Sequence, residues 1–477
     1  MTINRREFLV GSAVVAGAAL TQRRAWSAAV ATDVIVVGAG LSGLNAALLL
    51  EEAGLRVLVL EGRERVGGKI LTFSDVPGLP EAGGQSIGSG YGRLIDAANR
   101  SGVVLEDVLP RQLKHPEIAL VLDGAPVTKA AWPQSPRNPF PPSLRETMPW
   151  MYTPVAIAKA NPLQAIEDWI KPENARFDVS MYEFLKTQGA SDAMIDLAYD
   201  TNVSYGTSAH DVSALMMEFV EGFTRAQRGL KPAIYKARDG NQRIPEGMAR
   251  RLEAGVHLKQ VVTGIRADDR GVEVRTADDR RYQAKAVICA LPFSTLRHVR
   301  FDPLLAGAQR RAVATLPHQM ITQVALRSKR PFWEQDGLPP TMWTDSQIGR
   351  VFAIYGASDD EVSSLLVTAY GFKSAWLDRL GREAAGRYVV AEMERIRPAA
   401  KGALGVAGYH SWTLDPFSAG DWAYFAPGTV TQFMPAMFQP HGRVHFCGEQ
   451  TAVSARGMEG AMESGERAAL EVATLLG

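Results

Sequence analysis

The first strand pattern in the chain is a continuous apolar run over residues 34–37, which is typical of a parallel strand buried on both faces. A glycine-rich segment, residues 38–43, follows the run. Apolar residues then recur with helical spacing up to Ala53, and a second strand-like run, 56–60, which is apolar after Arg56, is followed by Glu61. This order predicts a strand–helix–strand unit.

The three glycines of that first turn have the spacing of a dinucleotide-binding fingerprint. Gly38 allows the tight turn, Gly40 admits a pyrophosphate close to the backbone, and Gly43 lets the helix pack on the strand. Glu61 follows at the sequence spacing typical of a carboxylate that accepts a hydrogen bond from a ribose hydroxyl. Because a helix N-terminus also attracts phosphate, the segment predicts nucleotide binding.

A second glycine-rich turn lies near the other end of the chain. An apolar strand pattern over 443–447 leads into Gly448, and a helix rich in small residues is expected from about Gly457. Two such turns, about 400 residues apart, predict one long cofactor that is held at two places.

Between the two turns the pattern changes several times. Residues 133–149 are proline-rich and predict a loop, 181–223 read mostly as helices, and 256–292 are β-rich. A strand over 323–326 and a helix over 384–396 are also expected. The fold class is therefore α/β with α+β elements: a Rossmann-like nucleotide domain (32–104, 236–311 and 412–477) interleaved with a mixed sheet-plus-helix substrate domain (105–235 and 312–411).

Composition narrows the functional classes. The 477 residues are 46% hydrophobic and 22% charged, with a formal net charge of +1, which gives no basic face for nucleic acid. Cys289 and Cys447, the two cysteines, lie in apolar runs and are expected to be buried free thiols. No histidine or cysteine spacing indicates a metal site.

The N-terminal residues 1–31 are expected to lie outside the fold. The pair Arg5 and Arg6 precedes an apolar, Ala/Gly-rich run that is shorter than the roughly 20 residues a membrane span needs. Small residues at 29–31 offer a cleavage site. The segment resembles a twin-arginine export signal, which implies a periplasmic location; an N-terminal anchor and a chance arginine pair are the alternatives. No other run is expected to span a membrane.

The motifs taken together resemble those of the flavin-containing amine oxidase family, which includes monoamine, polyamine, nicotine and L-amino-acid oxidases. The matching segments are residues 33–69, 81–88, 210–215, 290–292, 331–333, 415–428 and 443–469. The resemblance covers nearly the whole chain after residue 31. It implies that the cofactor is FAD.

The resemblance also implies which residues contact FAD: Gly38, Gly40, Leu41, Ser42, Gly43, Glu61, Gly62, Arg63, Gly67, Gly68, Lys69, Gly83, Gly84, Gln85, Val262, Trp412, Gly448, Glu449, Gly457 and Met458. Lys69 stands where the family usually has Arg, and keeps the charge without the fork geometry. Asp421 falls where monoamine oxidases have the cysteine that links flavin, so FAD is expected to be non-covalent.

The substrate site implied by the resemblance lies between two aromatic rings in front of the flavin. Trp422 matches one ring and Gly457 the other, so this cage is expected to be half open. Gln323 replaces a lysine that reaches flavin N5 through water. These three are the expected catalytic positions, and the other expected cavity residues are Val203, Ser204 and Tyr205.

Charged residues near the expected site leave alternatives open. Ile87 stands where amino-acid oxidases have an arginine that clamps the carboxylate, although Arg93 or Arg456 could substitute for it. Glu218 and Glu221 on the expected helix either attract a second cationic group or form a solvated face, and the solvated face is favoured.

The resemblance implies an FAD-dependent oxidation of a small-molecule amine. A hydride would pass from the α C–H to flavin N5, and the imine would hydrolyse to an aldehyde or ketone. The electron acceptor would be O2 or a periplasmic carrier such as a cytochrome or quinone. An L-amino-acid oxidase, a C–C dehydrogenating flavoenzyme and a non-catalytic flavoprotein are the alternatives. The oligomeric state stays open, and a homodimer is one option.

Overall fold

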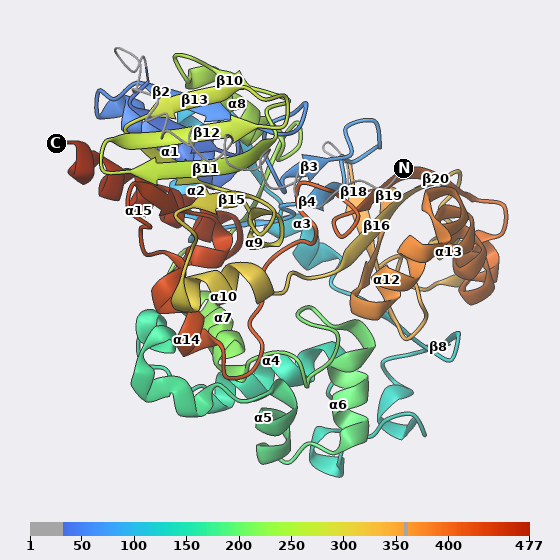
Figure 1. Cartoon of the computed structure of the whole chain (residues 1–477). Coiled ribbons are helices and arrows are strands. Elements are labelled where there is room, and N and C mark those ends of the chain that lie inside the picture. The colour runs from blue at the N-terminus through green and yellow to red at the C-terminus, as the bar shows by residue number, and fades with distance from the viewer. Residues whose placement is uncertain (1–31, 357–360) are drawn as a thin grey trace, which may run out of the picture. The chain divides into compact units, whose positions relative to one another are not determined.

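A five-stranded parallel sheet joins segments from distant parts of the chain in the computed structural model, which describes residues 32–356 and 361–477 (Figure 1). The strand order is β10-β2-β1-β14-β21. The bounds are β1 Val34–Val37, β2 Val57–Leu60, β10 Val256–His257, β14 Ala286–Cys289 and β21 Val444–Phe446. The apolar runs after Asp33 and before Glu61 therefore form the predicted strands, and every residue of β1 is buried.

Two helices pack directly on each other beside this sheet. They are α1 (Leu41–Glu52), which connects β1 to β2, and the C-terminal α15 (Gly457–Leu476). A Cβ built on Gly465 of α15 would lie 2.3 Å from the carbonyl oxygen of Ser42, so only glycine allows this approach. The two glycine-rich turns are thereby brought together, as the sequence predicts. Helices α2 (Gly92–Arg100) and α8 (Arg243–Arg251) also pack against this group.

A four-stranded sheet follows the order β13-β12-β11-β15. Its strands are β11 Val262–Asp268, β12 Gly271–Thr276, β13 Arg281–Ala284 and β15 Arg300–Asp302. Two smaller sheets pair β3 (Leu71–Thr72) with β4 (Glu81–Gly83), and β5 (Ile87–Gly88) with β9 (Ile234–Ala237) and β6 (Leu105–Asp107).

The largest sheet has seven strands in the order β20-β16-β19-β18-β17-β7-β8. Its strands are β7 Ala119–Leu122, β8 Ala125–Val127, β16 Ile321–Ser328, β17 Met342–Thr344, β18 Arg350–Tyr355, β19 Val362–Tyr370 and β20 Leu404–Ser411. Helices α12 (Gly371–Leu380) and α13 (Arg382–Ile396) pack against it (Figure 1). The expected strand at 323–326 and helix at 384–396 are both present.

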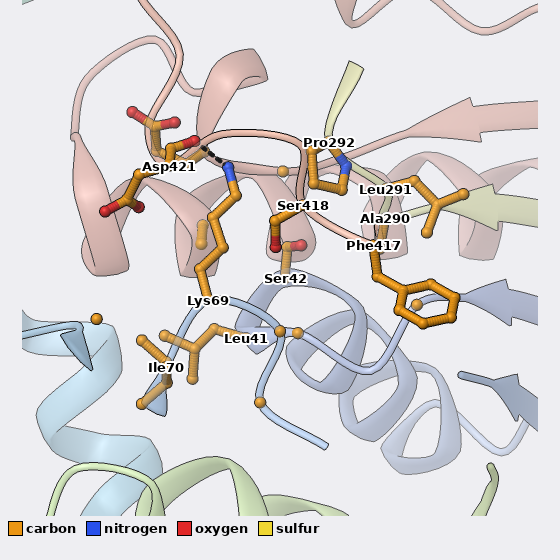
Figure 2. Close-up of a pocket in the computed structure, with 18 of the residues that line it drawn as sticks. Leu41, Ser42, Lys69, Ile70, Ala290, Leu291, Pro292, Phe417, Ser418 and Asp421 are labelled. Atoms are coloured by element: carbon orange, nitrogen blue, oxygen red, sulfur yellow. Dashed lines mark hydrogen bonds between the residues drawn. The ribbon is translucent and has the colours of Figure 1, made fainter. Parts of the chain in front are cut away.

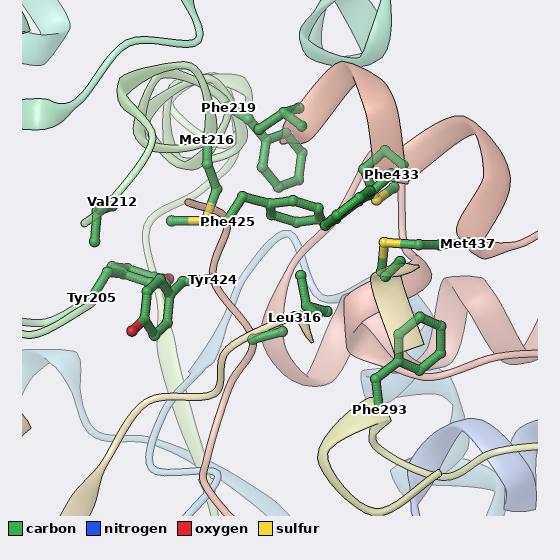
Figure 3. Packing of buried hydrophobic residues seen from close by; sticks show 14 of the residues in the cluster. Tyr205, Val212, Met216, Phe219, Phe293, Leu316, Tyr424, Phe425, Phe433 and Met437 are labelled. Carbon is green, nitrogen blue, oxygen red and sulfur yellow. The ribbon is translucent and has the colours of Figure 1, made fainter. Parts of the chain in front are cut away.

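A further group of helices comprises α4 Pro149–Ala160, α5 Met181–Thr187, α6 Asp192–Ala198, α7 Ala214–Ala226 and α14 Val430–Met437, and the remaining helices are α3 Leu109–Lys114, α9 Phe293–Leu296, α10 Gly307–Thr315 and α11 Phe332–Asp336. Phe219 of α7, Phe433 of α14 and Phe425 pack together in their core (Figure 3). A non-helical stretch at 203–213 interrupts the expected helical region 181–223, and Ser213 caps α7. The proline-rich loop contains two short 3-10 turns.

The mixed α/β fold class is confirmed. The division into a nucleotide domain and a substrate domain stays a prediction, and the twin-arginine segment lies outside the described residues. Within the described ranges, no helix is long and apolar enough to cross a membrane. The same ranges hold no group of three or more histidine, cysteine or acidic side chains that could bind a metal ion.

Candidate active site

A cavity of about 580 Å³ reaches from the first glycine-rich turn to the seven-stranded sheet. Its wall includes the start of α1, the loop at 61–70, the loop at 82–86, and the start of α15. Gln323, Thr368 and Tyr370 line it from β16 and β19, and Trp422 lines it from the loop before α14. Figure 2 shows Leu41, Ser42 and Lys69 on one side, with Pro292 and Ser418 on another.

The glycine turn of the cavity is fixed by backbone geometry. Gly38 has a φ of +104°, and its N–H donates to the carbonyl of Leu60 at 2.7 Å. A Cβ built on Gly43 would lie only 2.0 Å from the carbonyl oxygen of Gly38. The carboxylate of Glu61 accepts from the N–H of Ala39 at 2.8 Å and of Arg63 at 2.9 Å. The Glu61 carboxylate, directly after β2, therefore fixes the backbone of the glycine turn.

These features fit the diphosphate and ribose parts of FAD. Gly40 caps α1 without a side-chain hydrogen bond, and the first turn of α1 contains no acidic residue. Gly40 and Gly68 face each other across the cavity wall, and a Cβ on Gly68 would lie 3.1 Å from the Cα of Gly40. The uncapped helix N-terminus and the bare backbone around it form a site for an anion.

The cofactor positions expected from the sequence all line the cavity except Gly43 and Trp412. Gly43 lies behind the turn, where it allows the helix to approach the strand. Trp412 is fully buried, and its indole N–H donates to the carbonyl of Ala82 at 2.7 Å. A Cβ on Gly83 would lie 2.7 Å from the indole ring, so Trp412 supports the loop that lines the cavity.

A buried cation and two buried acids share one part of the wall. The Lys69 ammonium donates to the backbone carbonyl of Asp421 (Figure 2), and Glu449 accepts from the N–H of Ala423 at 3.3 Å. Burial lowers the pKa of Lys69, although both acids oppose this shift. Burial raises the pKa of Asp421 to about 7 and also raises that of Glu449. The three groups therefore form one electrostatically coupled cluster in the cavity wall.

The opposite end of the cavity is built from side chains. Gln323 pairs with Thr368 in the β16–β19 register, and both line the cavity. The Gln323 Oε1 and Thr368 Oγ1 atoms are buried without a hydrogen-bond partner among the described residues. Buried polar atoms are nearly always paired, so two adjacent unpaired atoms at a cavity indicate a ligand-binding position.

Trp422 is held rigidly at this end. Its indole N–H donates to the carbonyl of Ser204 at 3.0 Å. The rings of Tyr205 and Tyr370 lie 5.7 Å and 6.5 Å from it, centroid to centroid. Val203, Ser204 and Tyr205 do not line the cavity; Val203 and Tyr205 are buried, and the Tyr205 ring and the Ser204 carbonyl support the Trp422 indole.

Sequence patterns did not indicate several residues that line the cavity. Tyr91, Thr368, Tyr370 and Phe417 are the clearest cases. A Cβ on Gly62 would lie 2.6 Å from the Phe417 ring, so Phe417 requires a glycine at this position. The glycine after Glu61 was therefore a sequence signal that another group packs closely against the backbone there. Thr368 and Tyr370 could have been found only from the pairing of β19 with β16.

Two cysteine predictions and one glutamate prediction have clear outcomes. Cys289 and Cys447 are free and buried, as expected, and neither lines the cavity. The favoured interpretation of Glu218 and Glu221 as a solvated face is wrong. Glu218 is 2% exposed, and the Glu221 side chain is 9% exposed and ion-paired with Arg225 at 3.2 Å, because α7 is packed among other helices.

Comparison with known proteins identifies the family. The family model described as flavin containing amine oxidoreductase matches residues 41–473. The flavin-containing amine oxidase of Danio rerio is 30% identical over 477 aligned positions, which cover 94% of this chain and 87% of the relative. Human flavin-containing amine oxidase B is 27% identical and covers 93% and 86% of the two chains.

Solved structures share the fold. Cyclohexylamine oxidase from Brevibacterium oxydans superposes with a TM-score of 0.74 at 21% identity. Wild-type putrescine oxidase bound to putrescine gives 0.71 at 24% identity. Each match covers 93% of this chain and 99% of the other. The match over most of the chain and the glycine-lined cavity lead to one conclusion: the chain belongs to the flavin-containing amine oxidoreductase family, whose members are FAD-dependent enzymes that oxidise amines.

Proposed function

We propose that the chain oxidises an uncharged amine by transfer of a hydride from the carbon beside the nitrogen. FAD, when bound, would supply the hydride acceptor at N5, and the resulting iminium would lose a proton to give an imine that water hydrolyses to an aldehyde or ketone plus the released amine. The role of the protein is to bind the amine, fix its orientation and exclude water.

The observation that carries the proposal is the continuity of the cavity. One wall is the glycine turn that fits a diphosphate, and the other contains Trp422, Tyr370, Gln323 and Thr368. An amine bound against Trp422 therefore lies in the same enclosed space as the cofactor. Because Gln323 and Thr368 are neutral, they can hydrogen-bond a neutral amine.

Trp422→Ala tests the site. We expect the rate of anaerobic flavin bleaching by amines to fall at least about tenfold while FAD stays bound, because the ring that orients the amine is lost. Trp376→Ala is the matched control, since Trp376 packs on Tyr388 away from the cavity. An unchanged rate would remove Trp422 from the site. The compounds tested also include L-amino acids and non-amines. Flavin bleaching by those compounds alone would favour an L-amino-acid oxidase or a C–C dehydrogenating flavoenzyme.

We also propose that FAD is held without a covalent bond. Asp421, not a cysteine, lines the cavity at the position expected for the flavin link, and both cysteines lie elsewhere. Acid precipitation should release all of the flavin into the supernatant. Flavin that remains with the pellet would contradict this.

The electron acceptor is proposed to be a carrier other than O2. Gln323 supplies no positive charge where relatives have a lysine, and a positive charge near N5 would favour reduction of O2 to superoxide. Gln323→Lys should therefore speed reoxidation in air, and the wild type should reoxidise faster with a cytochrome or quinone. Rapid reoxidation of the wild type by O2 would overturn the proposal.

Export to the periplasm by the twin-arginine route is proposed from residues 1–31 alone. Replacing Arg5 and Arg6 together by lysine should leave the loaded protein in the cytoplasm, which cell fractionation measures. Equal periplasmic amounts of both forms would contradict the proposal.

A further inference from the structure

The space beside Gly457 holds a tyrosine from another part of the chain. Gly457 stands where a second cage ring is expected, and it has a φ of +59°. A Cβ built on Gly457 would meet one atom within 4 Å, the hydroxyl oxygen of Tyr91, at 3.9 Å. Tyr91 and Gly457 both line the cavity, together with Trp422. The expected half-open side of the cage is therefore occupied by a phenol.

The chain around Tyr91 is shaped to hold this ring in place. The N–H of Tyr91 donates to the carbonyl of Gly88 at 3.0 Å, and the ring packs against Phe223 of α7 at 5.8 Å. A Cβ on Gly88 would lie 3.2 Å from the Tyr91 ring, and one on Gly90 would lie 2.5 Å from Gln227. The two glycines thus allow both the tyrosine and the side chain of Gln227, which directly follows α7, to approach the loop.

The hydroxyl of Tyr91 is available to a ligand. It has no hydrogen-bond partner among the described residues, whereas its ring is fixed on both sides. Burial raises the pKa of Tyr91, while the Arg456 guanidinium nearby opposes this shift, so the hydroxyl keeps its proton at neutral pH. Arg456 itself stacks over Tyr205, 5.4 Å from the ring centroid.

We propose that Tyr91 is a specificity-determining residue whose hydroxyl donates a hydrogen bond to an oxygen acceptor on the substrate amine. The inference rests on the proposed amine oxidation and adds the class of amine: one with an ether, hydroxyl or carbonyl oxygen apart from the reacting carbon. An all-hydrocarbon amine would leave the hydroxyl unpaired in the cavity, which is costly for a buried donor.

Tyr91→Phe tests the inference with n-octylamine and the ether amines of the same length, in which oxygen replaces one methylene at successive positions. Two quantities are measured: the anaerobic bleaching rate per unit concentration, and the dissociation constant from the change in the oxidised flavin spectrum. For the best ether amine, both should worsen about three- to tenfold, whereas for n-octylamine both should stay unchanged or improve, because the variant removes the donor that this amine leaves unpaired. Tyr388→Phe, a remote tyrosine beside Trp376, should change neither.

The two proposals fail differently. Equal effects of Tyr91→Phe on n-octylamine and every ether amine would overturn the role of Tyr91, as would a wild type that binds n-octylamine better than all of the ethers. Ether amines that bind through Tyr91 without bleaching the flavin would refute the oxidation and support the role of Tyr91. Gly88→Ala, which displaces the ring while keeping the hydroxyl, should shift the preference in the same direction as Tyr91→Phe.

Discussion

The two ends of the cavity are built in different ways. At the cofactor end the wall is mainly backbone: a Cβ on Gly38 would lie 3.0 Å from the Ala290 carbonyl oxygen, and one on Gly68 would lie 3.1 Å from the Cα of Gly40. At the substrate end it is side chains, chiefly Trp422 and Tyr370, that define the space. The first arrangement tolerates little substitution at Gly38 and Gly68, because an added Cβ would crowd neighbouring backbone. The second can change with each side chain, so one fold can serve many amines.

The buried charges of the cofactor end and those of α7 also differ. At the cofactor end Glu61 accepts two backbone N–H groups and Lys69 contacts the loop at Asp421. On α7, by contrast, the Glu218 Oε2 atom is buried and has no partner among the described residues. Paired charges hold a fixed geometry, whereas an unpaired one costs stability unless it takes up a proton.

Gly43→Ala should have the largest effect. The new Cβ would lie 2.0 Å from the Gly38 carbonyl, which is backbone and cannot move aside. We expect the purified protein to lose its flavin, with the ratio of flavin to protein absorbance falling at least about tenfold, since overpacking against backbone costs several kcal/mol.

Gly405→Ala is the control for this change. A Cβ on Gly405 meets nothing within 4 Å, so flavin content and thermal stability should be preserved. If Gly43→Ala retained full flavin, the contrast between a fixed backbone end and a variable side-chain end would be lost.

This difference also explains what could be predicted from the sequence. The glycine turn is a local device, so the spacing of three glycines and an acid identified it, and the two turns at opposite ends of the chain indicated one long cofactor. Thr368 faces the cavity beside Gln323 only because β19 pairs antiparallel with β16 in one register. Tyr91 reaches Gly457 only through the packing of α7 on the loop before α2. Such contacts depend on long-range packing that residue spacing does not encode.

Lys69→Met should have the next largest effect. It removes the buried cation that lies near Asp421 and Glu449 and leaves two acids in an enclosed space. Breaking a buried charge group is costly, so we expect FAD to bind at least about tenfold more weakly, measured by the fluorescence of released flavin.

Two variants sharpen this test. Lys69→Arg keeps the charge and should retain FAD. Lys259→Met removes a surface lysine whose side chain is 69% exposed, and it should have no effect. FAD affinity that is unchanged in Lys69→Met would show that the backbone alone holds the cofactor.

Glu218→Gln should give a smaller, pH-dependent effect on α7, which does not line the cavity. Burial raises the pKa of Glu218 from its ordinary value near 4.5 to about 8, with Asp178 adding to the shift. Between pH 4.5 and about pH 8, Glu218 is ionised in the unfolded chain but keeps its proton in the folded chain. The wild type therefore loses stability as pH rises through this range. The variant should raise the melting temperature by a few degrees at pH 8.5 and by much less at pH 5.

Glu221→Gln is the matched control on the same helix. The Glu221 carboxylate is paired with Arg225 and accepts from Asn161 at 2.7 Å, so its loss should bring no gain at either pH. Equal gains in melting temperature for both variants would mean that the loss of any negative charge from α7 stabilises the protein, and not the loss of an unpaired group at Glu218.

Trp422→Phe should have the smallest effect, and it separates two roles of the same residue. Phenylalanine keeps an aromatic face toward the cavity but removes the indole N–H that donates to the Ser204 carbonyl at 3.0 Å. A neutral hydrogen bond contributes about 1 kcal/mol, so the bleaching rate should fall by about threefold to fivefold with FAD content unchanged. A loss as large as that of Trp422→Ala would mean that the anchored position of the ring, and not its face, determines the rate. The substrate end would then depend on fixed geometry as strictly as the cofactor end does.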